Sequence, residues 1–221
     1  MKPYADRCQA GQVLAKRVRL TESTAPIVLA LPRGGVPVAA EVAAVLGAPL
    51  DVIVVRKIGF LDNRELAMGA IATVAGNVET VTNSGTMARL DWLGRSHEEF
   101  AEVAERERRE LGLRDRLYRG DRPPADLCGR TAIVVDDGVA TGASMRAAVA
   151  AVRLSGSTQI VIAVPVCLPG ALSVLEEIAD EVVCPWIPEH FMAVGQAYQR
   201  FDQVPDDDVR AILGIGSGAS R

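Results

Sequence analysis

The fold is decided by one stretch of the chain, which reads AIVVDDGVATGAS at residues 132–144. Its apolar start, together with Thr131, predicts a buried strand that ends at Val135. Two carboxylates come next, and small and hydroxyl residues then lead into a helix expected at about 144–154. A buried strand joined by a short loop to a helix is the repeating unit of parallel α/β sheets.

The same alternation of strands and helices continues on both sides of this stretch. Buried strands are expected at 27–31, 52–55, 160–164 and 181–184, and helices at 36–46 and from about Gly170. Parallel strands must be joined by crossovers, and these helices supply them. We therefore expect an α/β fold with a doubly wound, mostly parallel sheet.

The segments between these units are more polar. Residues 56–66 break the apolar pattern and are expected to form a polar, mobile loop, while 67–81 read as two short strands around the turn pair Gly76-Asn77. Residues 96–119 place acidic and basic side chains four apart, at Glu102 and Arg106, Glu105 and Arg109, and Glu110 and Arg114. This spacing predicts a solvent-exposed helix. The alternative is that its arginines bind an anionic ligand or a partner subunit.

Composition narrows the class of protein. Hydrophobic residues make up 49% of the 221 residues, which is enough for a core, and the net charge of −4 gives no support for a nucleic-acid partner. Prolines interrupt the longest uncharged stretch, 158–175, so no membrane span is expected. No apolar segment follows residues 1–7, so no signal peptide is expected. The cysteines lack Cys-x-x-Cys spacing and read as reduced thiols of a cytoplasmic protein; they are Cys8, Cys128, Cys167 and Cys184.

The loop after the strand at 131–135 carries the chemistry. Ligands of open parallel sheets bind at the carboxyl ends of strands, where backbone N–H groups of a loop and a helix N-terminus favour phosphate. Thr141 and Ser144 add hydroxyl donors, and Gly142 lets the backbone approach closely. Asp136 and Asp137 suit a diol or a hydrated metal ion. Together these groups predict a site for a sugar phosphate. The alternative is that the two acids only cap the following turn.

This segment closely resembles the signature of the type I phosphoribosyltransferases, which bind 5-phosphoribosyl 1-diphosphate. The resemblance implies that the acids matching Asp136 and Asp137 meet the ribose hydroxyls, directly or through Mg²⁺. It also implies that the small-residue loop takes the 5-phosphate, and that loop consists of Ala140, Thr141, Gly142, Ala143 and Ser144.

Three further segments extend the resemblance to roughly residues 27–201. Arg33, Gly34 and Gly35 follow the first strand, where the family has its pyrophosphate loop. Arg56-Lys57 resembles the basic pair that contacts pyrophosphate in adenine and orotate phosphoribosyltransferases, with a closing loop behind it. Phe191 stands where the hood segment of the 6-oxopurine enzymes has a base-stacking aromatic, although it can equally be a core residue.

The resemblance also sets the expected domain organisation. One phosphoribosyltransferase domain is expected over 1–213, with a core at about 26–184 and a small hood at about 185–213 that includes an N-terminal contribution. Residues 214–221 are rich in glycine and serine and are expected to form a flexible tail or a linker.

The expected activity is transfer of the phosphoribosyl group from phosphoribosyl diphosphate to a small nitrogenous base, with Mg²⁺ as cofactor. Asp136, Asp137, Arg56 and Lys57 are the expected catalytic residues. The base is not identified, because Ala140 occupies the place where 6-oxopurine enzymes carry an acid. The rival hypothesis is a non-catalytic regulator that senses the same ligand, with Arg106–Arg122 as a partner surface. A sugar-phosphate hydrolase or kinase is disfavoured, since no P-loop or nucleophile elbow is present. Proteins of this fold often dimerise, so a homodimer is one expected state.

Overall fold

The computed structural model describes residues 2–20, 25–59, 67–74, 76–82 and 97–215. Most of the predicted mobile loop, at 60–66, and most of the predicted tail, at 216–221, lie outside these residues.

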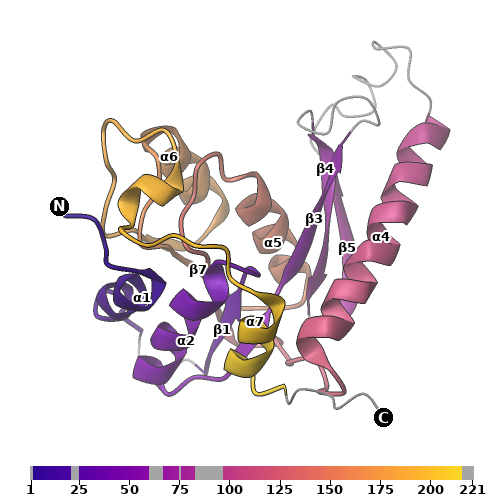
Figure 1. Ribbon diagram of the computed structural model, residues 1–221. Helices are drawn as coiled ribbons and strands as arrows, with labels where there is room; N and C mark the ends of the chain where they lie inside the picture. Colours follow the sequence, from indigo (N-terminus) through magenta and orange to yellow (C-terminus); the bar gives the residue numbers. More distant parts are fainter. Residues whose placement is uncertain (1, 21–24, 60–66, 75, 83–96, 216–221) are drawn as a thin grey trace.

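A five-stranded sheet forms the centre of the molecule, with the strand order β2-β1-β6-β7-β8 (Figure 1). The strands are β1 (Pro26–Ala30), β2 (Leu50–Val52), β6 (Thr131–Val135), β7 (Gln159–Ala163) and β8 (Glu181–Val183). All four neighbouring pairs are parallel. β1 and β6 lie side by side, with Ala30 opposite Val135. The loops that follow these two strands therefore leave from the same edge of the sheet.

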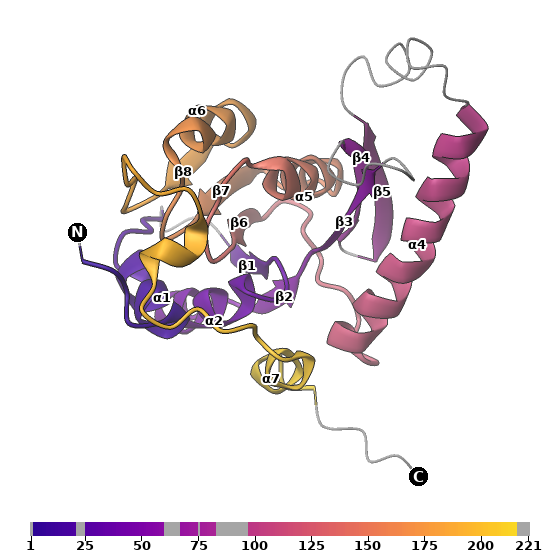
Figure 2. The ribbon, with the colours of Figure 1, turned by 45° about the horizontal axis from the view of Figure 1, so that its top comes forward.

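Helices cover both faces of this sheet (Figure 2). α1 (Arg7–Ala15) and α2 (Gly35–Leu46) lie on one face, and α5 (Ala143–Leu154) and α6 (Pro169–Ile178) lie on the other. Alternate residues of β6 point to opposite faces: Ile133 packs with the cluster that contains α1 and α2, whereas Val134 packs with the cluster that contains α5 and α6. The predicted doubly wound α/β fold is confirmed. Helix α1 was not predicted from the sequence.

A second, antiparallel sheet projects from the first beside the long helix α4 (His97–Arg119) (Figure 1). Its strands are β3 (Val54–Gly59), β4 (Ala67–Val74) and β5 (Asn77–Thr82), in the order β3-β4-β5. The two short strands expected within 67–81 are confirmed as β4 and β5, which meet at Gly76 with φ of 79°.

The strand boundary predicted between residues 52 and 56 is wrong. One strand was expected at 52–55 with a polar loop from Arg56, but β2 ends at Val52 and a separate strand, β3, runs through Arg56 and Lys57 to Gly59. The reason is tertiary. Arg56 pairs with Glu107 of α4, and Ile58 is fully buried, so contacts made far along the chain stabilise a strand whose own pattern is polar.

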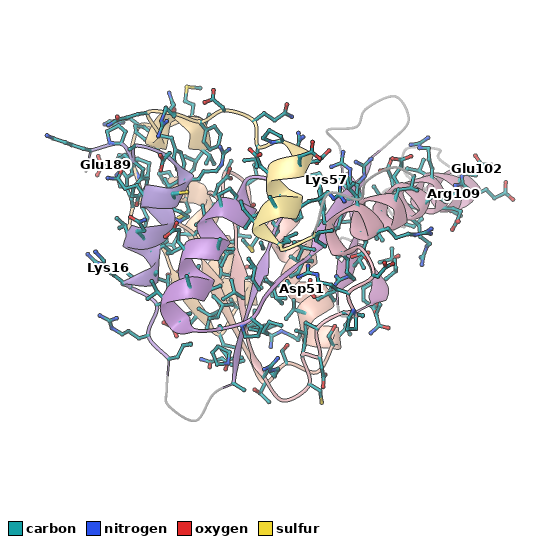
Figure 3. The ribbon with its side chains drawn as sticks, turned by 60° about the horizontal axis from the view of Figure 1, so that its bottom comes forward. Lys16, Asp51, Lys57, Glu102, Arg109 and Glu189 are labelled. Atoms are coloured by element: carbon teal, nitrogen blue, oxygen red, sulfur yellow. The ribbon has the colours of Figure 1, made fainter. Side chains whose placement is uncertain are left out.

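Helix α4 is exposed on one side and buried on the other. Glu102 and Arg109 project outward from it (Figure 3), whereas Val103, Leu111 and Tyr118 are buried. Of the three expected pairs four residues apart, the structure has one ion pair, between Glu105 and Arg109 at 4.0 Å. The prediction of a solvated helix is therefore correct for one face only.

Residues 4–5, near the N-terminus, lie against residues 197–200. The N–H of Tyr4 donates to the carbonyl of Ala197 at 2.8 Å, and the N–H of Gln199 donates to the carbonyl of Tyr4 at 2.8 Å. A short 3₁₀ helix, η1 (Val194–Ala197), precedes this contact, and α7 (Asp206–Ile212) follows it. No helix among the described residues is long and apolar enough to cross a bilayer.

Candidate functional site

Two loops meet at the carboxyl edge of the main sheet, one after β1 and one after β6. A Cβ atom placed on Gly34 would lie 1.9 Å from Oδ2 of Asp137. A Cβ on Gly35 would lie 2.8 Å from the carbonyl oxygen of Val135. Real Cβ contacts are not that short, so this packing is open to glycine alone at both positions. The structure thus brings the predicted pyrophosphate loop into contact with the predicted ribose loop.

The two acids differ in their partners. Oδ1 of Asp136 accepts the N–H of Asp137 at 2.8 Å, which is the local turn capping that the sequence left open. Oδ2 of Asp137 instead accepts Nε of Arg7 at 2.8 Å, from a residue at the other end of the chain. Burial raises the pKa of Asp136 well above its ordinary value, and the neighbouring Asp137 charge adds to the rise. Burial also raises the pKa of Asp137, and the Arg7 guanidinium opposes that rise.

Backbone hydrogen bonds with residues 166 and 168 fix the loop between the acid pair and α5. The N–H of Val139 donates to the carbonyl of Val166 at 3.0 Å, and the N–H of Leu168 donates to the carbonyl of Val139 at 2.9 Å. Gly142 has φ of 78°, a conformation that L-residues rarely adopt. It is the N-cap of α5 and has no side chain of its own, and no described side chain caps the first turn of that helix. The N–H groups there are available to an anion.

Exposure agrees with this role. Ala140 and Thr141 are exposed, and Ala143 and Ser144 are half-buried at the start of α5. Four of the five residues of the predicted phosphate loop therefore reach the surface, and Gly142 is buried beneath them.

A divalent metal ion fits the donor set only with help from a ligand. Asp136 and Asp137 supply hard carboxylate oxygens, which Mg²⁺ prefers. Among the described residues, no group of three metal-binding side chains is gathered in one place. Mg²⁺ commonly completes its shell with water and substrate phosphates, and a diphosphate beside two carboxylates would satisfy that requirement.

Comparison with known proteins agrees with this geometry. The model of the phosphoribosyl transferase domain family matches residues 6–199. Two Mycobacterium tuberculosis proteins, from strains CDC 1551 and H37Rv and provisionally named phosphoribosyl transferases, are each 43% identical over 217 residues. That match covers 96% of this chain and 47% of theirs, so the chain spans about half the length of these relatives.

A solved structure is similar over its whole length. The Thermus thermophilus protein TT1426 is 44% identical, with a TM-score of 0.83, over 96% of this chain and 98% of that one. The chain belongs to the phosphoribosyl transferase family.

In this phosphoribosyl transferase domain, the predicted basic residues are paired with carboxylates. A terminal guanidinium nitrogen of Arg33 lies 3.8 Å from Oδ1 of Asp206 on α7. Another, of Arg56, lies 2.6 Å from Oε2 of Glu107 on α4. The two arginines proposed for diphosphate therefore each have a carboxylate partner in the structure.

Arg56 and Lys57 face opposite sides of the small sheet, because neighbouring residues of a strand alternate. Arg56 points to α4, where it meets Glu107. Val55, two residues before Lys57 and on the same face, packs against the cluster that includes α5. Since α5 begins at the phosphate loop, Lys57 is on the face of the sheet that looks toward the site.

The aromatic side chains near the C-terminus form two groups. Phe191 packs edge-on against Trp186, with ring centroids 5.2 Å apart, in a cluster that includes Tyr4. Phe191 is only partly buried, so its role as a base-stacking ring stays a prediction. Phe201 stacks on Tyr198 at 4.9 Å and carries the Arg7 guanidinium 4.0 Å from its centroid, and both of these partners bond to Asp137.

Sequence reasoning missed Arg7 and Tyr198. Tyr198 donates its hydroxyl to the carbonyl of Asp137, and nothing in its local sequence signals this contact. The start of α1 could have been found, because Asp6 and Gln9 form a helix-start pattern, but the local sequence does not signal the contact of Arg7 with Asp137. Oδ1 of Asp6 accepts the N–H of Gln9 at 3.0 Å, and Arg7 is the first residue of that helix.

Proposed function

We propose that this domain transfers the 5-phosphoribosyl group of phosphoribosyl diphosphate to a nitrogenous base and releases diphosphate. The observation that supports the proposal best is the contact between Gly34 and Asp137. Because of this contact, the loop proposed to bind diphosphate lies directly beside the carboxylate proposed to bind the ribose. The open helix N-terminus at Gly142 adds a phosphate site on the same edge.

Each loop has one role in this proposal. The N–H groups and hydroxyls of residues 140–144 hold the 5-phosphate, and Asp136 and Asp137 hold the ribose 2- and 3-hydroxyls. The backbone of Gly34 and Gly35, with Arg33 and Lys57, receives the diphosphate.

The reaction breaks the bond between C1 of the ribose and the diphosphate oxygen, and a bond from a ring nitrogen of the base to C1 replaces it. Positive charge develops on the sugar, and the carboxylates of Asp136 and Asp137 stabilise it. A bound Mg²⁺, held by the same carboxylates, would neutralise charge on the leaving diphosphate. No side chain is assigned as general base, since Ala140 has no ionisable group.

A regulator that binds the same ligand without turnover is the second candidate. One observation supports it: Phe191, the residue expected to stack on a base, already has an aromatic partner in Trp186. The regulator hypothesis predicts that phosphoribosyl diphosphate binds while no base is consumed.

The first test is calorimetric titration of the chain with phosphoribosyl diphosphate, with and without Mg²⁺. The proposal predicts metal-dependent binding by the wild type and loss of most of it in Asp137→Asn, which keeps the shape of the side chain. Asp121→Asn, at an exposed position away from the site, is the matched control. Absence of binding with and without metal would refute the proposal.

The second test separates the enzyme from the regulator. Diphosphate release is followed with a panel of purine, pyrimidine and other nitrogenous bases, in the wild type and in Asp137→Asn. Release that requires one of the bases and is lost in Asp137→Asn supports the transferase. Tight binding with no release for any base supports the regulator.

A further inference from the structure

Arg7 makes three contacts at the edge of the site. Its Nε donates to Oδ2 of Asp137 at 2.8 Å, and a terminal nitrogen donates to the carbonyl of Asp202 at 2.7 Å. Its guanidinium also lies 4.0 Å from the centroid of the Phe201 ring. The side chain is only 12% exposed. An arginine so fully engaged has a fixed position rather than a solvated one.

The position of Arg7 is set by the helix that carries it. Asp6 caps α1, so Arg7 is its first residue. A Cβ on Gly11 would lie 2.7 Å from the carbonyl oxygen of Val38, which shows that α1 and α2 pack with their backbones close together. The loop at Arg33–Gly35 leads directly into α2. Arg7 and the proposed diphosphate loop therefore belong to one packed unit.

The C-terminal segment fixes Arg7 from the other side. The N–H of Arg200 donates to the carbonyl of Ala5 at 3.1 Å, and its guanidinium pairs with Asp6 at 2.5 Å. Tyr198 donates to the carbonyl of Asp137. Helix α1 thus contacts Asp137 through Arg7, and the segment after η1 contacts it through Tyr198.

The atom that Arg7 holds is one that the proposed substrate needs. Oδ2 of Asp137 is also the atom that faces Gly34, between the two loops. A ribose hydroxyl or metal ion that binds this oxygen would compete with the Nε bond of Arg7. The bond to Asp202 and the contact with Phe201 do not involve Asp137, so they keep the guanidinium beside the polyanionic ligand.

We propose that Arg7 is a positioning residue of the phosphoribosyl site, which orients the Asp137 carboxylate in the empty site and remains as a fixed positive charge when the ligand takes that carboxylate. This inference rests on the proposed function and deepens it. Arg7 does not contact the reacting bond. It acts through Asp137 and through its charge.

The test compares Arg7→Met, Arg7→Lys and the wild type by calorimetric titration with phosphoribosyl diphosphate and Mg²⁺. Arg7→Met removes the hydrogen bonds and the charge but keeps a side chain of similar length. We expect it to weaken binding by about tenfold, because it removes the fixed positive charge beside the polyanionic ligand and no longer orients the Asp137 carboxylate. Arg7→Lys keeps the charge and is expected to recover part of that loss. Arg19→Met, at an exposed arginine beyond α1, is the control and should bind as the wild type does.

A second probe separates positioning from a purely structural role. Inorganic phosphate needs only the loop at 140–144, so its affinity, measured by NMR titration, should be the same in Arg7→Met and the wild type. Weakening of phosphate and phosphoribosyl diphosphate by the same factor would mean that the variant disturbs the whole site, and would overturn the inference.

The remaining outcomes are also decisive. If Arg7→Met binds phosphoribosyl diphosphate as tightly as the wild type, or more tightly, the inferred role of Arg7 is wrong and the proposed function stays intact. A wild type that does not bind the compound at all refutes the proposed function, and the inference with it.

Discussion

Gly34 and Asp137 are so close that a single methyl group at Gly34 would lie 1.9 Å from Oδ2 of Asp137 and 2.6 Å from its Cγ. The two residues belong to different loops. Gly34 follows β1 and Asp137 follows β6, and their contact brings these two loops together. The Asp137 carboxylate cannot simply rotate away, because Arg7 holds the same oxygen at 2.8 Å.

Gly34→Ala should therefore disrupt the site more than the fold. We expect overpacking of this kind to cost about 1–3 kcal/mol in the free energy of unfolding, and affinity for phosphoribosyl diphosphate to fall by about tenfold or more, since the carboxylate must leave Arg7. Chemical denaturation and calorimetric titration measure the two effects. Gly170→Ala is the matched control, because a Cβ there meets nothing within 4 Å. Unchanged affinity in Gly34→Ala would show that the contact does not matter for binding.

We expect Lys57 to contribute to ligand binding and Arg56 to contribute to stability, although the two residues are neighbours in sequence. Arg56 is paired with Glu107 on the α4 face, whereas Lys57 is on the face shared with α5. Lys57→Met should lower affinity for phosphoribosyl diphosphate by about tenfold, as expected for loss of a charged contact to phosphate. Arg56→Met should lower it much less and should instead destabilise the domain, because the largely buried Glu107 loses its nearest partner and is left with Arg106 at 3.6 Å.

The same titrations, together with urea unfolding of both variants, measure these effects. A larger loss of affinity in Arg56→Met than in Lys57→Met would contradict the assignment of the faces. It would also mean that Arg56 leaves Glu107 when the ligand binds.

Asp136 should reduce the stability of the empty domain at neutral pH. Burial raises its pKa above the ordinary value of about 3.9. Between the unfolded and folded pKa values, the folded state binds more protons, so stability falls as the pH rises through that window. Above the window, the full cost of ionising a buried acid is present, and Asp136→Asn removes it.

We therefore expect Asp136→Asn to raise the melting temperature at pH 8 and to have little effect near pH 4. In a domain of this size, about 2–4 °C corresponds to each kcal/mol. Thermal unfolding is followed at both pH values in the presence of EDTA, so that no metal stabilises the wild type, with Asp121→Asn as control. An equal shift at both pH values would show that ionisation of Asp136 is not the cause. The gain in stability should come with loss of binding, as is common for residues kept for function.

The sequence predicted the parts of the fold that are coded locally. The strands β1, β6 and β7 are continuous apolar runs, and the loop from Asp136 to Ser144 has a distinctive order of acids and small residues. These features depend on neighbours in the sequence, so they could be read without the structure. The match of the chain to its family model agrees with that interpretation.

The parts that were missed depend on partners far along the chain. Arg7 and Asp137 are 130 residues apart in sequence, and Arg119 and Asp51 are 68 residues apart. The charged residues around Arg56 led us to predict a loop. The strand could not be predicted locally, because Glu107, the carboxylate partner of Arg56, is on another element. A single sequence carries no information about such pairs.

The buried pair of Arg119 and Asp51 gives the sharpest test of how α4 is attached. One nitrogen of Arg119 donates to both carboxylate oxygens of Asp51, at 2.8 and 2.6 Å, and the N–H of Ala125 donates to Oδ2 at 3.1 Å. Both side chains are less than 10% exposed. Asp115, 3.1 Å from Arg119, is a second carboxylate partner that the variant keeps. Asp51→Ala still removes an acceptor from the buried guanidinium and from the N–H of Ala125, and we expect it to cost about 1–3 kcal/mol in the free energy of unfolding.

Urea unfolding measures that cost, and Arg109→Ala supplies the contrast. Arg109 pairs with Glu105 at 4.0 Å, with both side chains more than half exposed, so its loss should change stability by about 0.5 kcal/mol or less. A cost below about 1 kcal/mol for Asp51→Ala would mean that water reaches the pair. The end of α4 would then be held by its other contacts, which include the buried side chains of Leu111 and Tyr118 and the hydrogen bond from the Tyr118 hydroxyl to Asp206. The arm formed by β3, β4, β5 and α4 would not depend on this salt bridge.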